Sequence, residues 1–329
     1  MSLEFFTPKD LSPTIMQEIV SFLDSQTTSH PFQFPQWSGA GSCLAVLRES
    51  DRIRWFANCG THFPLGTRLA ALRALTVNRG PVCDDPELWR AILGEFAEQM
   101  RQKRFIYLDA APDRLETAAS DRISGFGPGW NPLGEGRVSL RLNLSKSEDE
   151  LLAGLRKNTR YDVRRAERAE VKVEPSHGPS DADEFLRLYK SLAKRKGFSS
   201  DPEDHVLGII RWLENDPARG ALLLARDGAA VVGGAVIVRS GKRCWYVWGA
   251  SDKYDRFSAG QLLQWRAILW AKANGCTEYD FGGYTPDAIS GPAWFKEGFG
   301  GETVRFVPVL RNVFRPRWYR LVQALAKVR

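Results

Sequence analysis

Cysteine and histidine are scarce in this sequence and are never grouped. Its 329 residues include five cysteines and four histidines. The cysteines are scattered, odd in number and never in a C-x-x-C pair, which argues for a reducing compartment and against a disulfide framework or a zinc site. The histidines lie far apart, without an H-x-H or H-E-x-x-H pattern, so we expect no metal centre.

Long hydrophobic runs are missing as well. The longest apolar tract, Ala221 to Val238, is broken by Arg226-Asp227 and by Gly233-Gly234. It predicts a β-hairpin and not a membrane span. The N-terminus, M-S-L-E-F-F-T-P-K-D, has no basic region followed by an apolar core, so no signal peptide is expected. The expected location is therefore the cytoplasm.

Positive charge and tryptophan, in contrast, are abundant. The formal net charge is +7 and there are 11 tryptophans, in a composition that is 43% hydrophobic and 26% charged. This composition is typical of globular proteins, and the length predicts one large or two medium domains. The charge suits an anionic partner, which could be nucleic acid, a nucleotide or a phosphate-bearing substrate. Tryptophan often lines a ligand site but is as often part of a core.

Two stretches predict the same order of strand, turn, helix and strand. In the first, these elements are expected at residues 72–77, 78–81, 86–103 and 105–108. In the second, they are expected at residues 243–250, 251–260, 261–273 and 277–281. The pentapeptide W-R-A-I-L occurs in both expected helices, at Trp89–Leu93 and Trp265–Leu269. Order and sequence together favour a duplicated α/β unit over coincidence, and two copies side by side would form a cleft suited to binding.

Further helices are expected between these stretches, at residues 147–163, 181–196 and 204–213. The Gly- and Pro-rich segment 124–136 is interpreted as a connection between domains. Arg156 to Lys172 holds seven basic and three acidic residues. Two interpretations stay open for it, a set of phosphate contacts and a solvated helical face.

The segment Tyr279–Gly301 has the most unusual composition. Six glycines fall between Gly282 and Gly301, around Trp294, Phe295 and Lys296. Glycine allows a backbone to approach a ligand closely, and a lysine supplies a compact positive charge for a phosphate or a developing oxyanion. The alternative is a hairpin loop with a solvated lysine.

The tail from Thr303 to Arg329 has seven basic residues and no acidic one. Arg317 to Val328 is expected to form a helix with Leu321, Val322 and Leu325 on one side. Three interpretations are open for this tail: a solvated basic end, docking back onto the body of the protein, and contact with nucleic acid.

Five motifs together point to a known family. They are L-R-K-N-T-R-Y-D-V-R-R-A-E-R at Leu155–Arg168, R-K-G-F at Arg195–Phe198, Y-V-W-G-A-S at Tyr246–Ser251, Y-D-F-G-G with F-K-E-G-F-G-G after Tyr279, and N-R-G-P-V at Asn78–Val82. In these motifs the chain resembles the Fem-type (FemABX) aminoacyltransferases. The resemblance is good from about Val138 onward.

The resemblance implies an α/β fold of two tandem GNAT-like domains with a cleft between them. We expect the first at residues 1–136, the second at 137–306, and a basic helix at 307–329 that packs back on the first. The implied activity moves an amino acid from aminoacyl-tRNA to an amine of a UDP-linked or lipid-linked muropeptide precursor. It needs no cofactor, and peripheral membrane contact is possible.

The resemblance also implies roles for individual residues. Lys296 would stabilise an oxyanion or a terminal phosphate, and Phe295 would pack on the terminal nucleoside of the tRNA. The expected acceptor-binding residues are Arg195, which would meet a diphosphate, Tyr246 and Trp248 in the groove, Arg79 and Asp280. The expected tRNA or phosphate contacts are Arg156, Lys157, Arg160 and Arg164, since the interval before Asp204 leaves no room for a separate tRNA-binding arm.

The implied reaction agrees with the residues that the chain lacks. An aminoacyl ester is already activated, so its aminolysis needs orientation and oxyanion stabilisation more than a nucleophile on the protein. A carboxylate could take the proton of the amine, with Asp109, Asp280 and Asp252 as candidates. For Asp280, a purely local role at the end of a strand is the favoured interpretation.

Two other functions stay open. The first is an N-acyltransferase of surface-polysaccharide pathways that uses acyl-CoA such as acetyl-CoA. Its pyrophosphate loop would fall at Arg256–Gln261, where the glycine positions of the R/Q-x-x-G-x-G/A pattern are not met. The second is a module that binds polyanions without turnover.

Overall fold

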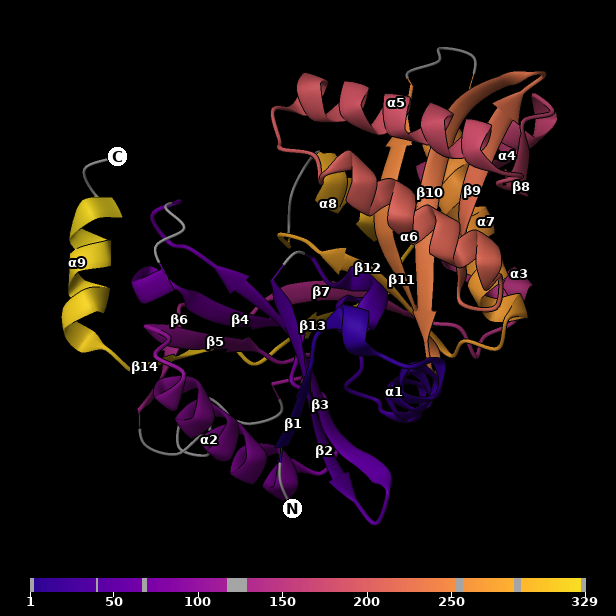
Figure 1. The fold of residues 1–329 in the computed structure, drawn as a ribbon. Helices are drawn as coiled ribbons and strands as arrows, with labels where there is room; N and C mark the ends of the chain where they lie inside the picture. Colours follow the sequence, from indigo (N-terminus) through magenta and orange to yellow (C-terminus); the bar gives the residue numbers. More distant parts are fainter. Residues whose placement is uncertain are drawn as a thin grey trace. The chain divides into compact units, whose positions relative to one another are not determined.

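The computed structural model describes residues 3–39, 41–66, 70–116, 129–252, 257–286 and 291–326. The chain forms two compact units, one of Met1–Arg137 with Arg305–Arg329 and one of Val138–Val304. Each unit contains its own seven-stranded sheet (Figure 1). The chain therefore has a mixed α/β architecture in two parts. The predicted cleft between the parts stays a prediction.

The sheet of the first unit has the order β1-β2-β3-β4-β5-β14-β6. Its strands are Leu3–Phe6 (β1), Ser42–Glu49 (β2), Arg52–His62 (β3), Ala74–Asn78 (β4), Tyr107–Ala111 (β5), Val309–Val313 (β14) and Trp130–Leu133 (β6). Its helices are Pro13–Ser25 (α1), Pro86–Gln102 (α2) and Pro316–Ala326 (α9), with short 3-10 turns at Pro8–Asp10, Pro31–Gln33, Pro35–Trp37 and Ala70–Leu72. β4 and β5 are parallel neighbours, and α2 is the crossover between them.

Helix α2 forms for reasons that are visible in its sequence. The Asp85 side chain accepts hydrogen bonds from the backbone amides of Glu87 and Leu88, and Pro86 occupies the first turn. The apolar side chains recur at helical spacing and are buried against the sheet. They are Trp89, Ile92, Leu93, Phe96 and Met100.

Part of the segment expected to be a connection is a strand. Residues 124–128 lie outside the described residues, but Trp130–Leu133 forms β6 and pairs with β14. The Trp130 side chain is buried in the first core, which ties this segment to the sheet. Pro132 is tolerated because β6 is an edge strand.

The basic tail belongs to the first unit. Its strand β14 lies between β5 and β6, and α9 follows it. Val322 of α9 is buried among Leu65, Leu72, Ala74, Ile106 and Tyr107, and Tyr319 packs against the same cluster.

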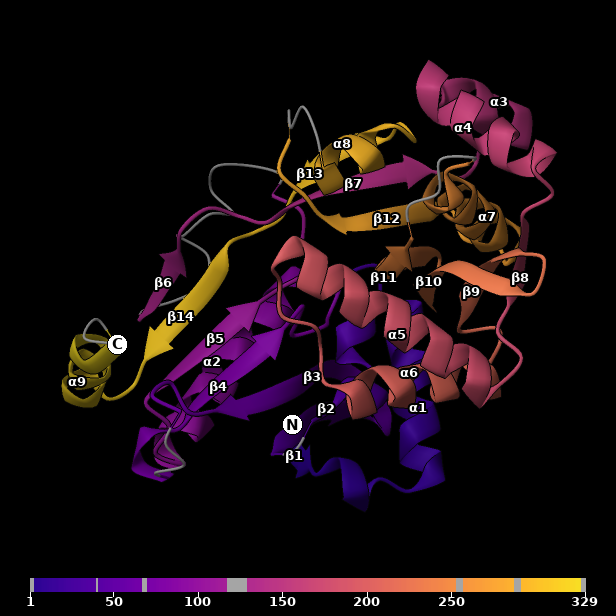
Figure 2. The same cartoon turned by 90° about the horizontal axis from the view of Figure 1, so that it is seen from above.

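The sheet of the second unit has the order β13-β7-β12-β11-β10-β9-β8 (Figure 2). Its strands are Glu302–Arg305 (β13), Val138–Asn143 (β7), Glu278–Gly283 (β12), Arg243–Ser251 (β11), Ala230–Ser240 (β10), Gly220–Asp227 (β9) and Lys172–Pro175 (β8). Its helices are Glu148–Gly154 (α3), Lys157–Arg168 (α4), Pro179–Lys196 (α5), Glu203–Asn215 (α6), Ala259–Ala273 (α7) and Gly291–Glu297 (α8). β11 and β12 are parallel, and α7 is their crossover.

The helix predicted at residues 147–163 is in fact two helices. Ser147 and Glu150 form the predicted capping box at the start of α3. The helix then ends at Leu155, whose ψ of 142° is extended. Here the Arg156 amide donates to the carbonyl of Gly298, 2.9 Å away. This contact with a distant segment takes the place of the next helical hydrogen bond, so a single helix was the wrong prediction.

The glycine-rich segment is not a hairpin loop either. Gly282 and Gly283 belong to β12, and Lys296 lies on the short helix α8. Residues 287–290 lie outside the described part of the chain. The alternative of a hairpin loop that carries a solvated lysine is therefore wrong about the secondary structure, because Lys296 lies on a helix.

The repeated pentapeptide occupies the same place in both sheets. It lies in α2 and in α7, which are the helices that join two parallel neighbours. Trp89 and Trp265, its first residues, are both buried. The same β-α-β unit thus occurs in both units, as the repeat predicts. Among the residues that the structure describes, no helix is long and apolar enough to cross a bilayer.

Candidate active site

The candidate site lies where two parallel strands of the second sheet stop pairing. β11 and β12 pair at three successive positions, from Arg243 opposite Glu278 to Trp245 opposite Asp280. β11 then continues to Ser251 with a bulge that leaves Val247 without an opposite residue on β10. Carboxyl ends of parallel strands are common binding positions in α/β sheets, because side chains and backbone groups of several strands meet there.

Asp280 is buried at this point and is fully engaged. One of its oxygens accepts from the Ser139 hydroxyl at 2.5 Å and from the Gly282 amide at 2.8 Å. The other accepts from Arg141 Nε at 3.1 Å, from the position directly opposite on β7. These donors hold the carboxylate in a fixed position.

Lys296 places its ammonium at the end of β12. Its Nζ donates to the Gly283 carbonyl at 2.9 Å. A Cβ on Gly282, whose φ is +75°, would lie 4.0 Å from this nitrogen and 3.5 Å from the Tyr246 carbonyl oxygen. Glycine is needed here for its positive φ.

The protonated form of Lys296 is less favoured than that of an ordinary lysine. Burial lowers its pKa to about 8, and the negative charge of Asp280 partly opposes that effect. At pH 7 the ammonium form therefore still prevails. A partly desolvated cation interacts more strongly with a nearby anion than one in bulk water, so it can stabilise an oxyanion or a phosphate.

Phe295 lies beside the start of α7. A Cβ on Gly260 would lie 3.7 Å from the Phe295 ring and 3.3 Å from the Ser251 hydroxyl. The ring also contacts Phe299 edge to face, with centroids 5.4 Å apart. The end of β11, the first turn of α7 and α8 thus meet around Phe295 and Lys296.

Tyr246 and Trp248 of β11 are both held firmly. A Cβ on Gly249 would overlap the Tyr246 hydroxyl, so the G-A-S motif makes room for this ring. Burial raises the pKa of Tyr246 to about 12, which keeps its hydroxyl protonated. Trp248 is buried and donates from Nε1 to Asp201 at 2.8 Å. The Tyr189 hydroxyl donates to the same oxygen at 3.1 Å.

Arg195 connects two of the predicted motifs. It lies in the last turn of α5 and donates from its guanidinium to the Ser251 carbonyl at 3.1 Å. Gly197 ends the helix in the left-handed conformation, with φ of +71°. The R-K-G-F motif is therefore a helix cap that holds Arg195, an exposed residue, next to the end of β11.

Of the four residues predicted to contact phosphates, two are bound to neighbouring helices and two are exposed. Arg156 pairs with Glu297 at 3.5 Å and lies 4.8 Å from the Trp294 ring, which fastens it to α8. Arg160 donates to the Ala153 carbonyl at 2.8 Å and so caps α3. Lys157 and Arg164 are exposed. Phosphate binding by these four residues stays a prediction.

The remaining predicted residues lie elsewhere. Arg79 is in the first unit, in the turn after β4, with φ of +62°. Asp109, also in the first unit, forms a two-pronged ion pair with Arg311, both N–O distances being 2.6 Å. Asp252 follows β11, and its amide donates to the Val232 carbonyl at 3.0 Å. The structure thus brings Tyr246, Asp280, Phe295 and Lys296 together in the second unit, with Arg195 joined to them through Ser251.

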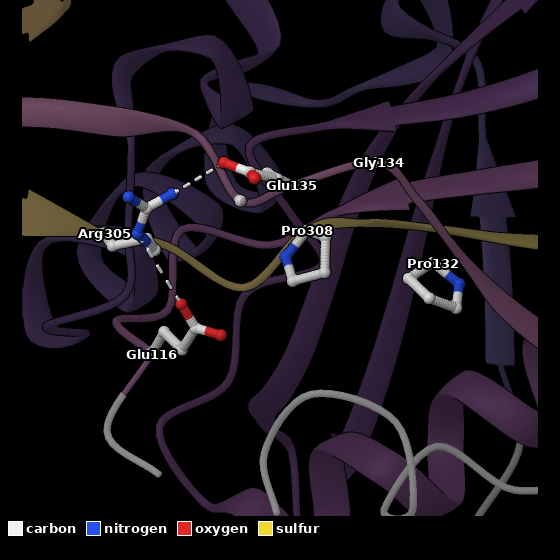
Figure 3. A pocket seen from close by; sticks show the side chains of 7 residues that line it. Glu116, Pro132, Gly134, Glu135, Arg305 and Pro308 are labelled. Atoms are coloured by element: carbon white, nitrogen blue, oxygen red, sulfur yellow. Dashed lines mark hydrogen bonds and ion pairs between the residues drawn. The ribbon is translucent and has the colours of Figure 1, made fainter. Parts of the chain in front are cut away.

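A cavity of about 380 Å³ in the first unit has a different lining (Figure 3). Arg305 lies between Glu116 and Glu135, with N–O distances of 4.0 and 3.3 Å. Pro132, Gly134 and Pro308 complete most of the wall. Its one arginine is already paired with two carboxylates, and no predicted site residue lines it.

Four supporting residues were missed by the sequence reasoning. Ser139 and Arg141 alternate on β7, so the period of a strand places both on the same face. Polar residues at alternate positions of an otherwise apolar strand were the available signal for a buried carboxylate partner. Asp201 and Tyr189 gave no such signal, because their partner Trp248 is 47 residues from Asp201.

Comparison with known proteins finds similar sequences and structures. A family described as "Acetyltransferase (GNAT) domain" matches residues 153–297, which include Asp280 and Lys296. The chain is 22% identical over 187 residues to the UDP-N-acetylmuramoylpentapeptide-lysine N(6)-alanyltransferase of Weissella viridescens. That match covers 56% of this chain and 55% of the relative, so it spans about half of the Weissella enzyme.

Solved structures extend the likeness to nearly the whole chain. The crystal structure of FemX is 17% identical, covers 98% of this chain and 99% of its own, and has a TM-score of 0.81. The predicted resemblance to the Fem-type family is confirmed. The predicted fold of two tandem GNAT-like domains is confirmed as well. The structure of L-PGS from Bacillus licheniformis shares the fold at 12% identity, with a TM-score of 0.61 over 95% of this chain and 96% of its own.

Proposed function

We propose that this Fem-type chain is an aminoacyltransferase that forms an amide bond between the aminoacyl group of an aminoacyl-tRNA and an amine of a cell-wall precursor. The observation that carries the proposal is the position of Lys296. Its ammonium lies at the end of β12, beside two glycines and the buried carboxylate of Asp280. The name of the Weissella enzyme, an alanyltransferase on a muropeptide lysine, supports the choice of reaction.

In the proposed reaction, the acceptor nitrogen attacks the carbonyl carbon of the aminoacyl ester. A C–N bond forms, and the carbonyl oxygen takes up the negative charge, which the Lys296 ammonium stabilises. The carbonyl then re-forms while the C–O ester bond breaks, and the ribose oxygen leaves. The proton released by the amine ends on that ribose hydroxyl. No step needs a nucleophile, metal or cofactor of the protein.

Asp252 is the carboxylate that we propose as proton carrier. Asp109 and Asp280, the other two candidates, are held in ion pairs with Arg311 and Arg141. Asp252 follows the end of β11 and, within the described ranges, its side chain forms no ion pair. It is therefore the one of the three whose oxygens are available to an incoming amine.

The substrates follow from the charges around the site. We propose a UDP-linked or lipid-linked muropeptide as acceptor, its diphosphate near Arg195 and its stem beside Tyr246 and Trp248. Lys157 and Arg164, exposed on α4, would contact the phosphates of the tRNA. Aminoacyl-tRNA is a cytoplasmic metabolite, so we propose that the reaction takes place there.

Transfer from acyl-CoA is the second candidate. The match to the GNAT family and the first turn of α7 beside Phe295 favour it, because helix amides can hold a pyrophosphate. The loop predicted to do so begins at Arg256, which lies outside the described residues, as do residues 253–255.

Ligand-induced stabilisation separates the two candidates. The thermal midpoint of the chain is measured with acetyl-CoA, with a UDP-linked muropeptide and with an acylated mimic of the tRNA acceptor end. A ligand that binds only the folded state raises the midpoint, by an amount equivalent to about 2.7 kcal/mol at a hundred times its Kd. We expect responses to the muropeptide and the tRNA mimic. A response to acetyl-CoA alone would replace the first candidate by the second.

A further inference from the structure

Helix α9 exposes an apolar stripe. Trp318, Leu321 and Leu325 are 38%, 45% and 47% exposed, and they are three of the large apolar side chains most open to solvent in the described part of the chain. At about 100° per residue they fall within a sector of about 60° on the helix surface. Val322 and Tyr319, on an adjoining side, pack on the first unit. The stripe is thus not needed to hold α9 in place.

The charged residues in this part of the sequence all have the same sign. From Thr303 to the last residue the chain has seven basic residues and no acidic one. Arg317 and Arg320 are exposed on α9, and the Arg315 guanidinium lies 5.3 Å from the Trp318 ring. Figures 1 and 2 show α9 after β14 at the margin of the first unit.

Exposed apolar side chains that are scattered singly need no explanation, but a contiguous group of them beside like charges does. A solvated basic end does not account for a tryptophan and two leucines in one sector. Contact with nucleic acid would use the arginines and leave the leucines unused. A lipid surface uses both, since interfacial helices bury an apolar face that includes tryptophan while arginines meet the headgroups.

We propose that α9 docks the protein on an anionic membrane surface. Trp318, Leu321 and Leu325 enter the boundary between headgroups and acyl chains, and Arg317 and Arg320 bind lipid phosphates. The described part of the helix has 11 residues, so we expect weak and reversible binding. The proposal does not depend on the reaction assigned to Lys296, and it gives a physical basis to the membrane contact that the sequence leaves possible.

Cosedimentation with vesicles tests the apolar half of the proposal. The full-length chain is mixed with vesicles of phosphatidylcholine, with or without phosphatidylglycerol, and the bound fraction is measured. We expect binding only when phosphatidylglycerol is present. The double variant Leu321→Gln, Leu325→Gln should bind at least about tenfold more weakly, because each leucine loses apolar burial. Ala324→Gln, which places the same side chain on the exposed side away from the stripe, should bind like the wild type.

A variant that lacks two arginines tests the electrostatic half of the proposal. Arg317→Gln, Arg320→Gln should weaken binding to the anionic vesicles by roughly thirtyfold, since one arginine near such a surface contributes about fivefold. Its binding should also depend less on salt than that of the wild type. Equal thermal midpoints of all variants show that the substitutions leave the fold intact, as expected for exposed positions.

Three outcomes overturn the proposal. The first is vesicle binding by the Leu321→Gln, Leu325→Gln variant that equals the wild type, and the second is no vesicle binding by the wild type. The third is binding of a labelled RNA in place of vesicles, which Arg317→Gln, Arg320→Gln abolishes and the leucine variant does not. The third result would assign the tail to nucleic acid.

Discussion

Both units contain a buried aspartate on the strand that follows the crossover helix, and both aspartates pair with an arginine directly opposite on an antiparallel neighbour. In the first unit these are Asp109 on β5 and Arg311 on β14. In the second they are Asp280 on β12 and Arg141 on β7. The register of aspartate and arginine is thus the same in both units. In the first unit the arginine follows the aspartate in the sequence, and in the second unit it precedes the aspartate. The pair is therefore a feature of the shared fold.

The surroundings of the two pairs differ. In the first unit β4 and β5 stay paired as far as Asn78 and Ala111, and Arg311 also donates to the Tyr319 hydroxyl at 3.0 Å. In the second unit pairing stops at the level of Asp280, and the Lys296 ammonium lies beyond it. Duplication of a fold thus supplies the anchored carboxylate twice. In the second copy, where the strands stop pairing early, the Lys296 ammonium lies beyond that carboxylate.

The largest effect is expected from breaking each ion pair. Asp280→Ala removes the buried carboxylate that pairs with Arg141 Nε, and loss of such a buried partner typically lowers the free energy of unfolding by about 3–5 kcal/mol. Asp109→Ala should cost less, because the Arg311 side chain is 19% exposed and that of Arg141 only 8%. Urea denaturation measures both. Turnover per folded molecule should fall only for Asp280→Ala, and an equal fall for Asp109→Ala would refute the distinction between the units.

Removal of the Lys296 charge should lower catalysis in a protein that still folds. Lys296→Ala is expected to lower kcat by about 10²–10³, the usual loss when one oxyanion-stabilising group is removed. Lys146→Ala, at an exposed lysine of the same unit, serves as the matched control and should keep full activity. The measurement is single-turnover transfer with a saturating donor. Full activity of Lys296→Ala would refute the proposed mechanism.

The pH dependence gives a smaller and more specific effect. With a pKa of about 8, Lys296 should lose its proton as the pH rises, so its contribution to the rate should be about tenfold smaller at pH 9 than at pH 7. Lys296→Arg keeps the charge at both values and should lack this decline. The same decline in both proteins would assign it to another group.

The lowered pKa also has a consequence for stability. Between about pH 8 and pH 10.4 the unfolded chain binds the lysine proton more tightly than the folded chain does, so the stability contributed by this group rises with pH over that range. Lys296→Met should therefore raise the thermal midpoint at pH 7 and have little effect at the upper end of the range.

The smallest effect concerns the two helices that share W-R-A-I-L. Gly94, just after the pentapeptide in α2, has room for a methyl group, since beyond its own helix backbone no atom lies within 4 Å of the position that a Cβ would take. Gly94→Ala should stabilise the protein by roughly 0.5–1 kcal/mol, through better helix propensity. Gly260→Ala in α7 would put a Cβ 3.3 Å from the Ser251 hydroxyl, and should bring no such gain. Denaturation midpoints of the two variants decide between them.

Local signals in the sequence predicted most of the elements. Asp85 before Pro86, and Ser147 with Glu150, mark helix starts that the structure contains. These signals work because capping and periodicity involve residues only a few positions apart. The glycine-rich segment with Lys296 was recognised as a candidate site for a similar reason, since its composition differs from that of its neighbours.

The same reasoning could not predict contacts between residues that are far apart in the sequence. The break between α3 and α4 depends on a hydrogen bond from Arg156 to Gly298, and the anchoring of Asp280 depends on Ser139 and Arg141. Each of these pairs is separated by about 140 residues of chain, so no local pattern contains both members.

The sequence by itself determined where most helices and strands form, that one β-α-β unit occurs twice, and which lysine has glycines around it in the sequence. Those properties follow from backbone preferences and apolar periodicity, which act over a few residues. Only the tertiary structure decided that Asp280 is held by Ser139 and Arg141, that Lys296 lies on a helix at the end of β12, and that burial lowers its pKa. Burial and charge pairing are set by the neighbours that a residue acquires on folding, and those come from all parts of the chain.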